Sequence, residues 1–269
     1  MTDFNLVPLL PEIFLSLVGM GLLIVGVSQG NVSTRVVCWA CAAGFAITAL
    51  ILLGIGWETQ TVLNGMFVMD KFAGFMKLLI LMGLIASMAL SVRYIIQEGM
   101  ERFEYPILIV FAGIGMIMMV SANNLLSLYM ALVLQSLSLY VLAAFHRNSV
   151  RSSEAGIKYF VLGALSSGML LFGISLIYGF TGTIDFAVLA DTIGGLSTVP
   201  YGLTFGLVFL LAGLAFKISA VPLHLWPPDV YQGAPTSVTA LFARVPNVSA
   251  LALRMRFLFE LCLGMRGVW

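Results

Sequence analysis

The stretch Leu203–Phe216, LTFGLVFLLAGLAF, contains no charged residue and leads directly into Lys217. Pro222 follows five residues later, and His224 comes shortly after it. An apolar run of this kind, within a span of about 20 residues, is typical of a membrane-crossing helix. A charged side chain near the bilayer centre costs roughly 2.5–3.5 kcal/mol, so it usually faces a bundle interior or water. The stretch therefore predicts a membrane helix that carries a buried amine and is broken at Pro222.

The composition of the whole chain supports a membrane location. Of its 269 residues, 61% are hydrophobic and 9% are charged, and the mean hydropathy is +1.06. A soluble domain carries about 25% charged residues, and a fold of this size could not cover its surface with so few. This excludes a cytosolic enzyme and a disordered chain. The net charge of +1 also excludes a nucleic-acid binder, which needs a basic face.

Eight stretches have the length and composition of spanning helices, which predicts an all-α polytopic membrane protein without strands. They lie at about Leu9–Val27, Val36–Ile55, Phe72–Ile96, Pro106–Ser121, Leu125–Phe145, Gly156–Phe180, Tyr201–Trp226 and Val238–Leu263. The one long connection is Thr181–Pro200. Within it, Ile184–Ile193 is expected to form a short surface helix capped by Thr183.

The basic residues in short loops predict the orientation of the chain. Loops on one side hold Arg35, Arg93, Arg102, Arg147 and Arg151. Loops on the other side hold Lys71 with the acidic Asp3, Glu58, Asp70, Asp185 and Asp191. The basic side is expected to face the cytoplasm or the mitochondrial matrix, with the N-terminus on the periplasmic or intermembrane-space side. No cleavable signal peptide is expected, because Asp3 and Glu12 stand where such a peptide is basic.

The segment after Leu203 holds the candidates for proton transfer. An amine in a polar cavity can take and release a proton, because burial disfavours its charged form. The alternative for Lys217 is snorkelling to the nearer surface. Pro222 removes a backbone donor and either breaks the helix, as in ion-transport sites, or marks a simple kink or helix end. His224 suits a water-linked relay or a structural role.

Other ionisable residues and cysteines have more ordinary interpretations. Lys158 lies near the start of its helix, where a lysine usually snorkels, and Glu154 can pair with it at i,i+4. Lys77 is expected to be an interfacial anchor. Cys38 and Cys41 have the spacing of a redox pair but lie in an apolar run, where thiols usually only pack. The sequence shows no metal-ligand motif, nucleotide-binding loop or serine–histidine–acid set.

Three segments resemble the antiporter-like subunit N family of the proton-pumping NADH–quinone oxidoreductase, respiratory complex I. The family's fifth helix is similar to Ser121–Tyr129 (SANNLLSLY) with Gln135–Tyr140 (QSLSLY). Its broken seventh helix and following loop are similar to Phe216–Trp226 (FKISAVPLHLW) with Pro228–Thr236 (PDVYQGAPT). Glu154–Phe160 (EAGIKYF) fits the sixth helix, and the likeness runs over nearly the whole chain.

The resemblance implies an antiporter-like fold. Residues 1–104 would form three N-terminal helices and 105–269 the first inverted repeat of five helices, whereas the second repeat is missing. By resemblance, Lys217 is the proton-transfer lysine, Lys158 its sixth-helix companion, and His224 a part of the central hydrophilic axis. NADH, FMN, iron–sulfur clusters and quinone would reside in partner subunits, and none in this chain. The implied partners are other membrane subunits of complex I and the lipid bilayer, and no nucleic acid.

Two positions depart from the family's pattern. Val133 stands where the family usually has a glutamate that pairs with the central lysine, and Asn247 stands where it usually has a lysine. The first repeat is also expected to be truncated or diverged at its end. Three functions therefore stay open: a proton-translocating subunit of complex I, a subunit of a multisubunit cation/proton antiporter, or a non-pumping truncated scaffold.

Overall fold

The computed structural model describes residues 6–30, 34–196 and 198–261. Its helices are α1 (Leu10–Gln29), α2 (Thr34–Gly54), α3 (Lys71–Gln97), α4 (Glu104–Val120), α5 (Leu125–Ala143), α6 (Val150–Thr181), α7 (Phe186–Gly194), α8 (Tyr201–Lys217), α9 (Trp226–Gly233), α10 (Thr236–Phe242) and α11 (Val245–Leu261). A 3₁₀ turn, Val7–Leu9, precedes α1. Two strands, β1 (Gln60–Val62) and β2 (Phe67–Met69), separate α2 from α3. Asp3 and the end of the last predicted span lie outside the described residues.

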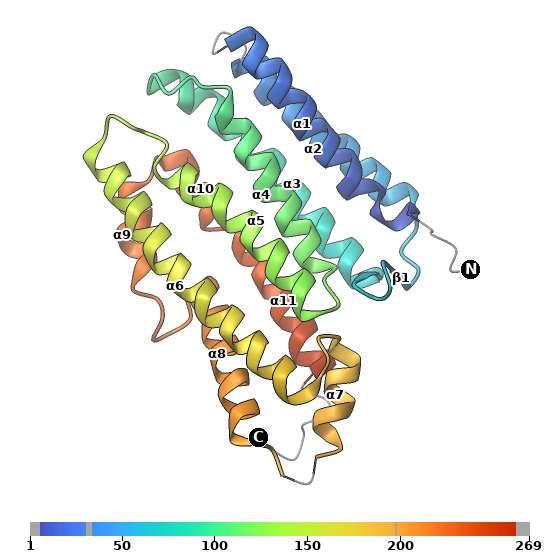
Figure 1. Cartoon of the computed structure of the whole chain (residues 1–269). Coiled ribbons are helices and arrows are strands. Elements are labelled where there is room, and N and C mark those ends of the chain that lie inside the picture. Colours follow the sequence, from blue (N-terminus) through green and yellow to red (C-terminus); the bar gives the residue numbers. More distant parts are fainter. Residues whose placement is uncertain (1–5, 31–33, 197, 262–269) are drawn as a thin grey trace.

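The helices lie side by side in a slanted bundle (Figure 1). Helices α1 and α2 form one edge, α6 and α8 form the other, and α3, α4, α5 and α11 fill the space between them. Among the described residues, α2, α3, α5, α6 and α1 with its preceding turn are long and apolar enough to cross a membrane. Helices α4 and α8 are apolar but have only 17 residues each. The fold is an all-α membrane bundle, as predicted.

The prediction that the chain has no strands was wrong in one place. Strands β1 and β2 form an antiparallel hairpin in which Gln60 pairs with Met69. Asn64 and Gly65 both have positive φ, of 54° and 86°. Asn-Gly is the strongest short hairpin signal, because both residues adopt this conformation easily. The sequence therefore contained the signal, although three-residue strands are too short to show an alternating pattern.

A short helix does occupy the long connection, as predicted, but its cap is different. The Asp185 carboxylate accepts hydrogen bonds from the backbone N–H groups of Ala187 and Val188, at 3.0 and 3.4 Å. Thr183 instead accepts a bond from the Asp185 N–H. Helix α7 therefore begins two residues later than expected, at the same end of the bundle as the hairpin.

The last two predicted spans are each interrupted. The span expected over Tyr201–Trp226 ends as helix α8 at Lys217. The span expected over Val238–Leu263 is divided into α10 and α11 by Ala243 and Arg244. Pro246 explains the second break, because it has no N–H to donate to the carbonyl of Phe242. It stands instead in the first turn of α11, where a missing N–H costs nothing.

Candidate functional site

Helix α8 ends at Lys217 in a Schellman motif. Ser219 has a φ of 57°, the N–H of Ala220 donates to the carbonyl of Ala215 at 2.9 Å, and the N–H of Ser219 donates to the carbonyl of Phe216 at 3.1 Å. These two bonds satisfy carbonyls that a helix end leaves unpaired. The helix is therefore closed five residues before Pro222, and the predicted break at Pro222 is displaced to Lys217.

The chain between α8 and α9 stays non-helical for eight residues. Pro222 lies exposed within this segment, where it cannot supply the N–H that would continue the helix. The indole N–H of Trp226, the first residue of α9, donates to the carbonyl of Phe216 at 3.0 Å. The broken end of α8 is thus fixed from both sides, and Lys217 is held at a defined place.

The amine of Lys217 faces the bundle interior. It donates to the hydroxyl of Ser136 at 2.8 Å and to that of Tyr140 at 3.2 Å, both on α5. Among the described residues, no carboxylate pairs with it. The negative end of the α8 dipole lies at Lys217 and stabilises a positive charge there. Lys217 therefore does not snorkel to a surface; its proton is held by neutral hydroxyls and a helix end.

A cavity of about 30 Å³ adjoins this amine. It is large enough for about two water molecules, since each needs about 10–15 Å³. Helices α4, α5, α6, α8, α9, α10 and α11 converge on it, and its polar lining is Gln135, Ser136, Tyr159, Lys217, Trp226, Asn247 and Arg254. The side-chain oxygen of Gln135 is buried and accepts no hydrogen bond from any described residue. A water in this cavity would satisfy that oxygen.

Asn247 and Val133 occupy the two positions that depart from the family's pattern. Asn247 lines the cavity and donates to the carbonyl of Ala243 at 3.1 Å. Val133 stands one turn before Ser136 and two turns before Tyr140, so the three residues share one face of α5. The wall that meets Lys217 therefore carries hydroxyls on α5 and an amide on α11, without an acid.

Lys158 lies apart from this cavity. Its side chain is 43% exposed and its amine pairs with carboxylate oxygens of Glu154 and Asp229, each at 2.8 Å. The predicted i,i+4 pair with Glu154 is thus confirmed. Lys158 lines a separate groove of about 220 Å³ with Arg151, and not the cavity of Lys217. The aromatic neighbour of Lys158, Tyr159, does line that cavity, where it stacks on Trp226 at 4.7 Å.

His224 is exposed in the segment between α8 and α9. It does not line the Lys217 cavity, and no hydrogen bond or ion pair joins it to another described residue. The structure therefore brings Lys217 together with Asn247, but brings neither Lys158 nor His224 to the same cavity.

Sequence reasoning missed the residues that hold the amine. Ser136 and Tyr140 are spaced i,i+4 and so share a face of α5, which is the signal that could have identified them. Gly163 on α6 leaves room for the Tyr140 hydroxyl, because a side chain there would collide with it. Arg254 also lines the cavity, two turns after Asn247 on α11.

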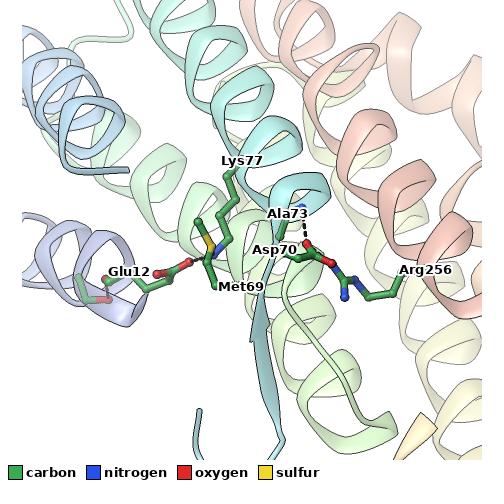
Figure 2. A network of polar contacts seen from close by, with 7 residues as sticks. Glu12, Met69, Asp70, Ala73, Lys77 and Arg256 are labelled. Carbon is green, nitrogen blue, oxygen red and sulfur yellow. Dashed lines mark hydrogen bonds and ion pairs between the residues drawn. The ribbon is translucent and has the colours of Figure 1, made fainter. Parts of the chain in front are cut away.

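The interpretation of Lys77 as an interfacial anchor was wrong. Its side chain is only 1% exposed, and its amine pairs with a carboxylate oxygen of Glu12 on α1 at 2.6 Å (Figure 2). Because Glu12 is 65 residues away in the chain, the sequence around Lys77 does not indicate that the lysine is buried and paired. Cys38 and Cys41 are both buried, free thiols.

Comparison with known proteins places this architecture in a class. Residues 122–268 match the family described as NADH:quinone oxidoreductase/Mrp antiporter, transmembrane. The chain belongs to this family of antiporter-like membrane subunits.

Particular relatives cover nearly all of the chain. It is 54% identical over 262 residues to NADH-quinone oxidoreductase subunit N of Parvibaculum lavamentivorans, covering 97% of this chain and 54% of that protein. It is 51% identical over 268 residues to the subunit N of Rhodobacter capsulatus, covering 99% of this chain and 55% of that protein. The chain thus spans about half the length of the curated relatives it matches.

Two solved structures show the same fold. A chain of respiratory complex I from Thermus thermophilus superposes with a TM-score of 0.76 at 30% identity, covering 91% of this chain and 52% of that one. A chain of the Mrp complex from Dietzia superposes with a TM-score of 0.75 at 22% identity, covering 100% of this chain and 51% of that one. The second likeness is one of fold alone.

Proposed function

We propose that this chain acts as a proton-translocating membrane subunit of an NADH–quinone oxidoreductase, with Lys217 as its proton-transfer group. One observation carries the proposal: the Lys217 amine faces a water-sized interior cavity at the end of a broken helix and contacts only neutral hydroxyls. An amine without a carboxylate partner gains little from staying charged away from bulk water, so a modest change in the surrounding charge shifts its proton occupancy.

The step that we propose is a transfer of one proton between Lys217 and the adjacent water. The protonated amine bonds to Ser136 and Tyr140. A positive charge that arrives in a neighbouring subunit disfavours the ammonium, and the proton leaves to water held near Gln135. Electron transfer from NADH to quinone occurs in partner subunits, which hold FMN, iron–sulfur clusters and quinone. The free energy released by electron transfer reaches this chain because the protonation of Lys217 is coupled to the charge state of a neighbouring subunit.

We propose that protons enter through the ionisable groups of the groove lined by Lys158 and Arg151. Lys158 and Glu154 on α6 form a charge triad with Asp229 on α9. His224 lies exposed in the segment after α8, outside that groove. We assign Lys158 to proton collection at this groove and His224 to proton collection in the exposed segment after α8. Both act in series with Lys217 and outside its cavity.

The proposed setting is a bacterial inner membrane or the mitochondrial inner membrane, beside other membrane subunits of complex I. Arg102, Arg147 and Arg151 lie at helix ends opposite the hairpin, which supports a cytoplasmic or matrix location for that end. The N-terminus would then lie on the periplasmic or intermembrane-space side. We further propose that 1–104 form a three-helix N-terminal unit and that 105–269 form part of the first antiporter-like repeat.

Substitution of Lys217 in the assembled complex tests this function. In membrane vesicles, Lys217→Ala is expected to retain assembly and to lose proton translocation driven by NADH oxidation. The matched control is Lys71→Ala, which removes an exposed lysine at the start of α3. Undiminished translocation in Lys217→Ala, relative to this control, would count against the proposal.

The family also includes Mrp antiporter subunits, so a cation/proton antiporter is the second candidate. The two candidates differ in what drives the proton. Proton flux that requires a sodium gradient and continues without NADH would favour the antiporter. A complex whose NADH-driven proton translocation is unchanged by Lys217→Ala would favour a scaffold.

A further inference from the structure

A fully buried lysine lies in the N-terminal helices, away from the Lys217 cavity. Lys77 on α3 and Glu12 on α1 form an ion pair of 2.6 Å, with side chains 1% and 5% exposed (Figure 2). The amine also contacts the sulfur of Met69 at 3.7 Å and lies 4.5 Å from the centre of the Phe67 ring. None of these partners can share a proton except the carboxylate of Glu12.

The carboxylate of Glu12 has unused acceptor capacity. Neither of its oxygens makes a hydrogen bond of good geometry with any described residue, although Oε1 lies within ion-pair distance of Lys77. A buried carboxylate in a structural role usually accepts several hydrogen bonds. An under-bonded carboxylate beside a buried ammonium has little to keep it charged, apart from that ammonium.

A second ion pair connects this site to α11. Asp70 caps α3 by accepting from the N–H of Ala73 at 2.7 Å, and it also accepts two bonds from the Arg256 guanidinium at 2.9 and 3.0 Å (Figure 2). Met69, which contacts Lys77, precedes Asp70 in the chain. The charged groups around Lys77 are therefore Glu12 from α1, Asp70 at the start of α3, and Arg256 from α11.

We propose that Glu12 and Lys77 form a second proton-exchange site, separate from Lys217 and placed in the three N-terminal helices. Stability alone is a weak reason for such a pair, because apolar replacements of a buried ion pair are often neutral or stabilising. A pair in which one acid and one amine face each other at 2.6 Å can exchange a proton without moving any backbone.

The exchange balances in charge and in atoms. A proton moves from Lys77 Nζ to Glu12 Oε1, so one N–H bond breaks, one O–H bond forms, and a neutral amine and a neutral acid remain. The neutral amine then takes a proton from a hydronium ion, which becomes water, and the site gains one net positive charge. Release of the carboxyl proton to water returns the site to the ion pair. One proton has then passed through the site.

The net positive charge of this site can influence the Lys217 cavity electrostatically. Its charge acts on Arg256 and Asp70, and Arg256 lies two residues from Arg254, which lines that cavity. Helix α11 packs against both α3 and α4. A proton gained at Glu12 and Lys77 therefore changes the force on the helix that forms one wall of the Lys217 site.

Charge-balanced substitution distinguishes proton exchange from a structural ion pair. We would compare Glu12→Gln, Lys77→Met and the double variant in the assembled complex, measuring the amount of complex, quinone reduction and proton translocation. The proposal expects the double variant to assemble and reduce quinone but to translocate protons at background level, since loss of a proton-transfer group costs on the order of 100-fold. Wild-type translocation by the double variant would overturn the proposal.

Infrared difference spectra of the wild-type complex after a pH change provide a second readout. The proposal expects a carboxylic-acid carbonyl band that disappears in Glu12→Gln and persists in Lys217→Ala. This persistence separates the site from the proposed role of Lys217. If the neutral variants fail to assemble, Glu12→Asp carries the test, because it keeps the charge and changes the distance. Unchanged translocation and an unshifted band in Glu12→Asp would overturn the proposal.

Discussion

Two lysines that face the interior of this molecule, the half-buried Lys217 and the buried Lys77, are held in opposite ways. Lys217 contacts two hydroxyls and a helix end beside a water-sized cavity, whereas Lys77 contacts a carboxylate in a tightly packed apolar surrounding. Neutral neighbours leave the Lys217 amine to exchange its proton with water, whereas the Glu12 carboxylate gives Lys77 a partner that can take its proton directly. An interior position therefore does not by itself define what a lysine does. The charge of the groups that directly contact its amine defines it.

The largest expected effect comes from removing one member of the paired site. Lys77→Ala leaves Glu12 buried without its counter-ion, and breaking a buried pair in this way typically costs about 3–5 kcal/mol. Lys217→Ala loses only hydrogen bonds to neutral groups, about 1 kcal/mol each. Thermal unfolding of the purified complex is expected to show a much larger shift for Lys77→Ala. Equal shifts would contradict the contrast between the two lysines.

The room that α6 leaves for Tyr140 provides the next test. Gly163→Ala places a methyl group where the Tyr140 hydroxyl lies, so the ring must move and release Lys217. Overpacking of this kind costs about 1–3 kcal/mol, and proton translocation is expected to fall with it. The control is Gly168→Ala on the same helix, where no atom lies within 4 Å of the added carbon. Equal proton translocation in Gly163→Ala and Gly168→Ala would contradict the role of Tyr140 in holding Lys217.

Supplying the missing acid should make Lys217 resemble Lys77. Val133→Glu places a carboxylate on the face of α5 that carries Ser136 and Tyr140. A carboxylate near the ammonium favours the charged form, so the amine is expected to hold its proton about tenfold more tightly, or about 1.4 kcal/mol. The pH profile of proton translocation should move towards alkaline pH. Val133→Gln, which adds polarity without charge, should leave the profile where it was.

The smallest expected effect, on the free energy of unfolding, comes from Ser219 at the broken end of helix α8. Ser219 adopts a left-handed conformation that costs an L-residue roughly 1 kcal/mol. Ser219→Gly is therefore expected to raise the free energy of unfolding by up to about 1 kcal/mol, because glycine adopts this conformation freely. Ser219→Ala should give no such gain. A loss of stability in the glycine variant would show that the hydroxyl of Ser219, and not the backbone, closes the helix.

The sequence predicted what depends on local composition. The bundle, the inward-facing position of Lys217 and the short helix α7 all follow from apolar runs and their interruptions. The contacts between distant segments could not be predicted in this way. Glu12 and Lys77 each stand near one end of an apolar run. Only the packing of both α1 and α3 against α2 and α4 brings them together as a pair.

The break in α8 shows a different limit of local reasoning. Pro222 was the visible helix breaker, but the hydrogen bonds close the helix at Lys217 through Ser219, a residue type that seldom adopts positive φ. The burial of Ser136 and Tyr140 against Lys217 also depends on the exact register between α5 and α8. No single-sequence pattern fixes that register.

Replacement of Lys217 by arginine tests the central claim most directly. Arginine keeps the positive charge but cannot release its proton in a protein. If Lys217 transfers a proton, membrane vesicles containing Lys217→Arg will assemble the complex and oxidise NADH but translocate protons no faster than Lys217→Ala. Translocation at the wild-type rate by Lys217→Arg would show that only a fixed charge is required, and would contradict the account.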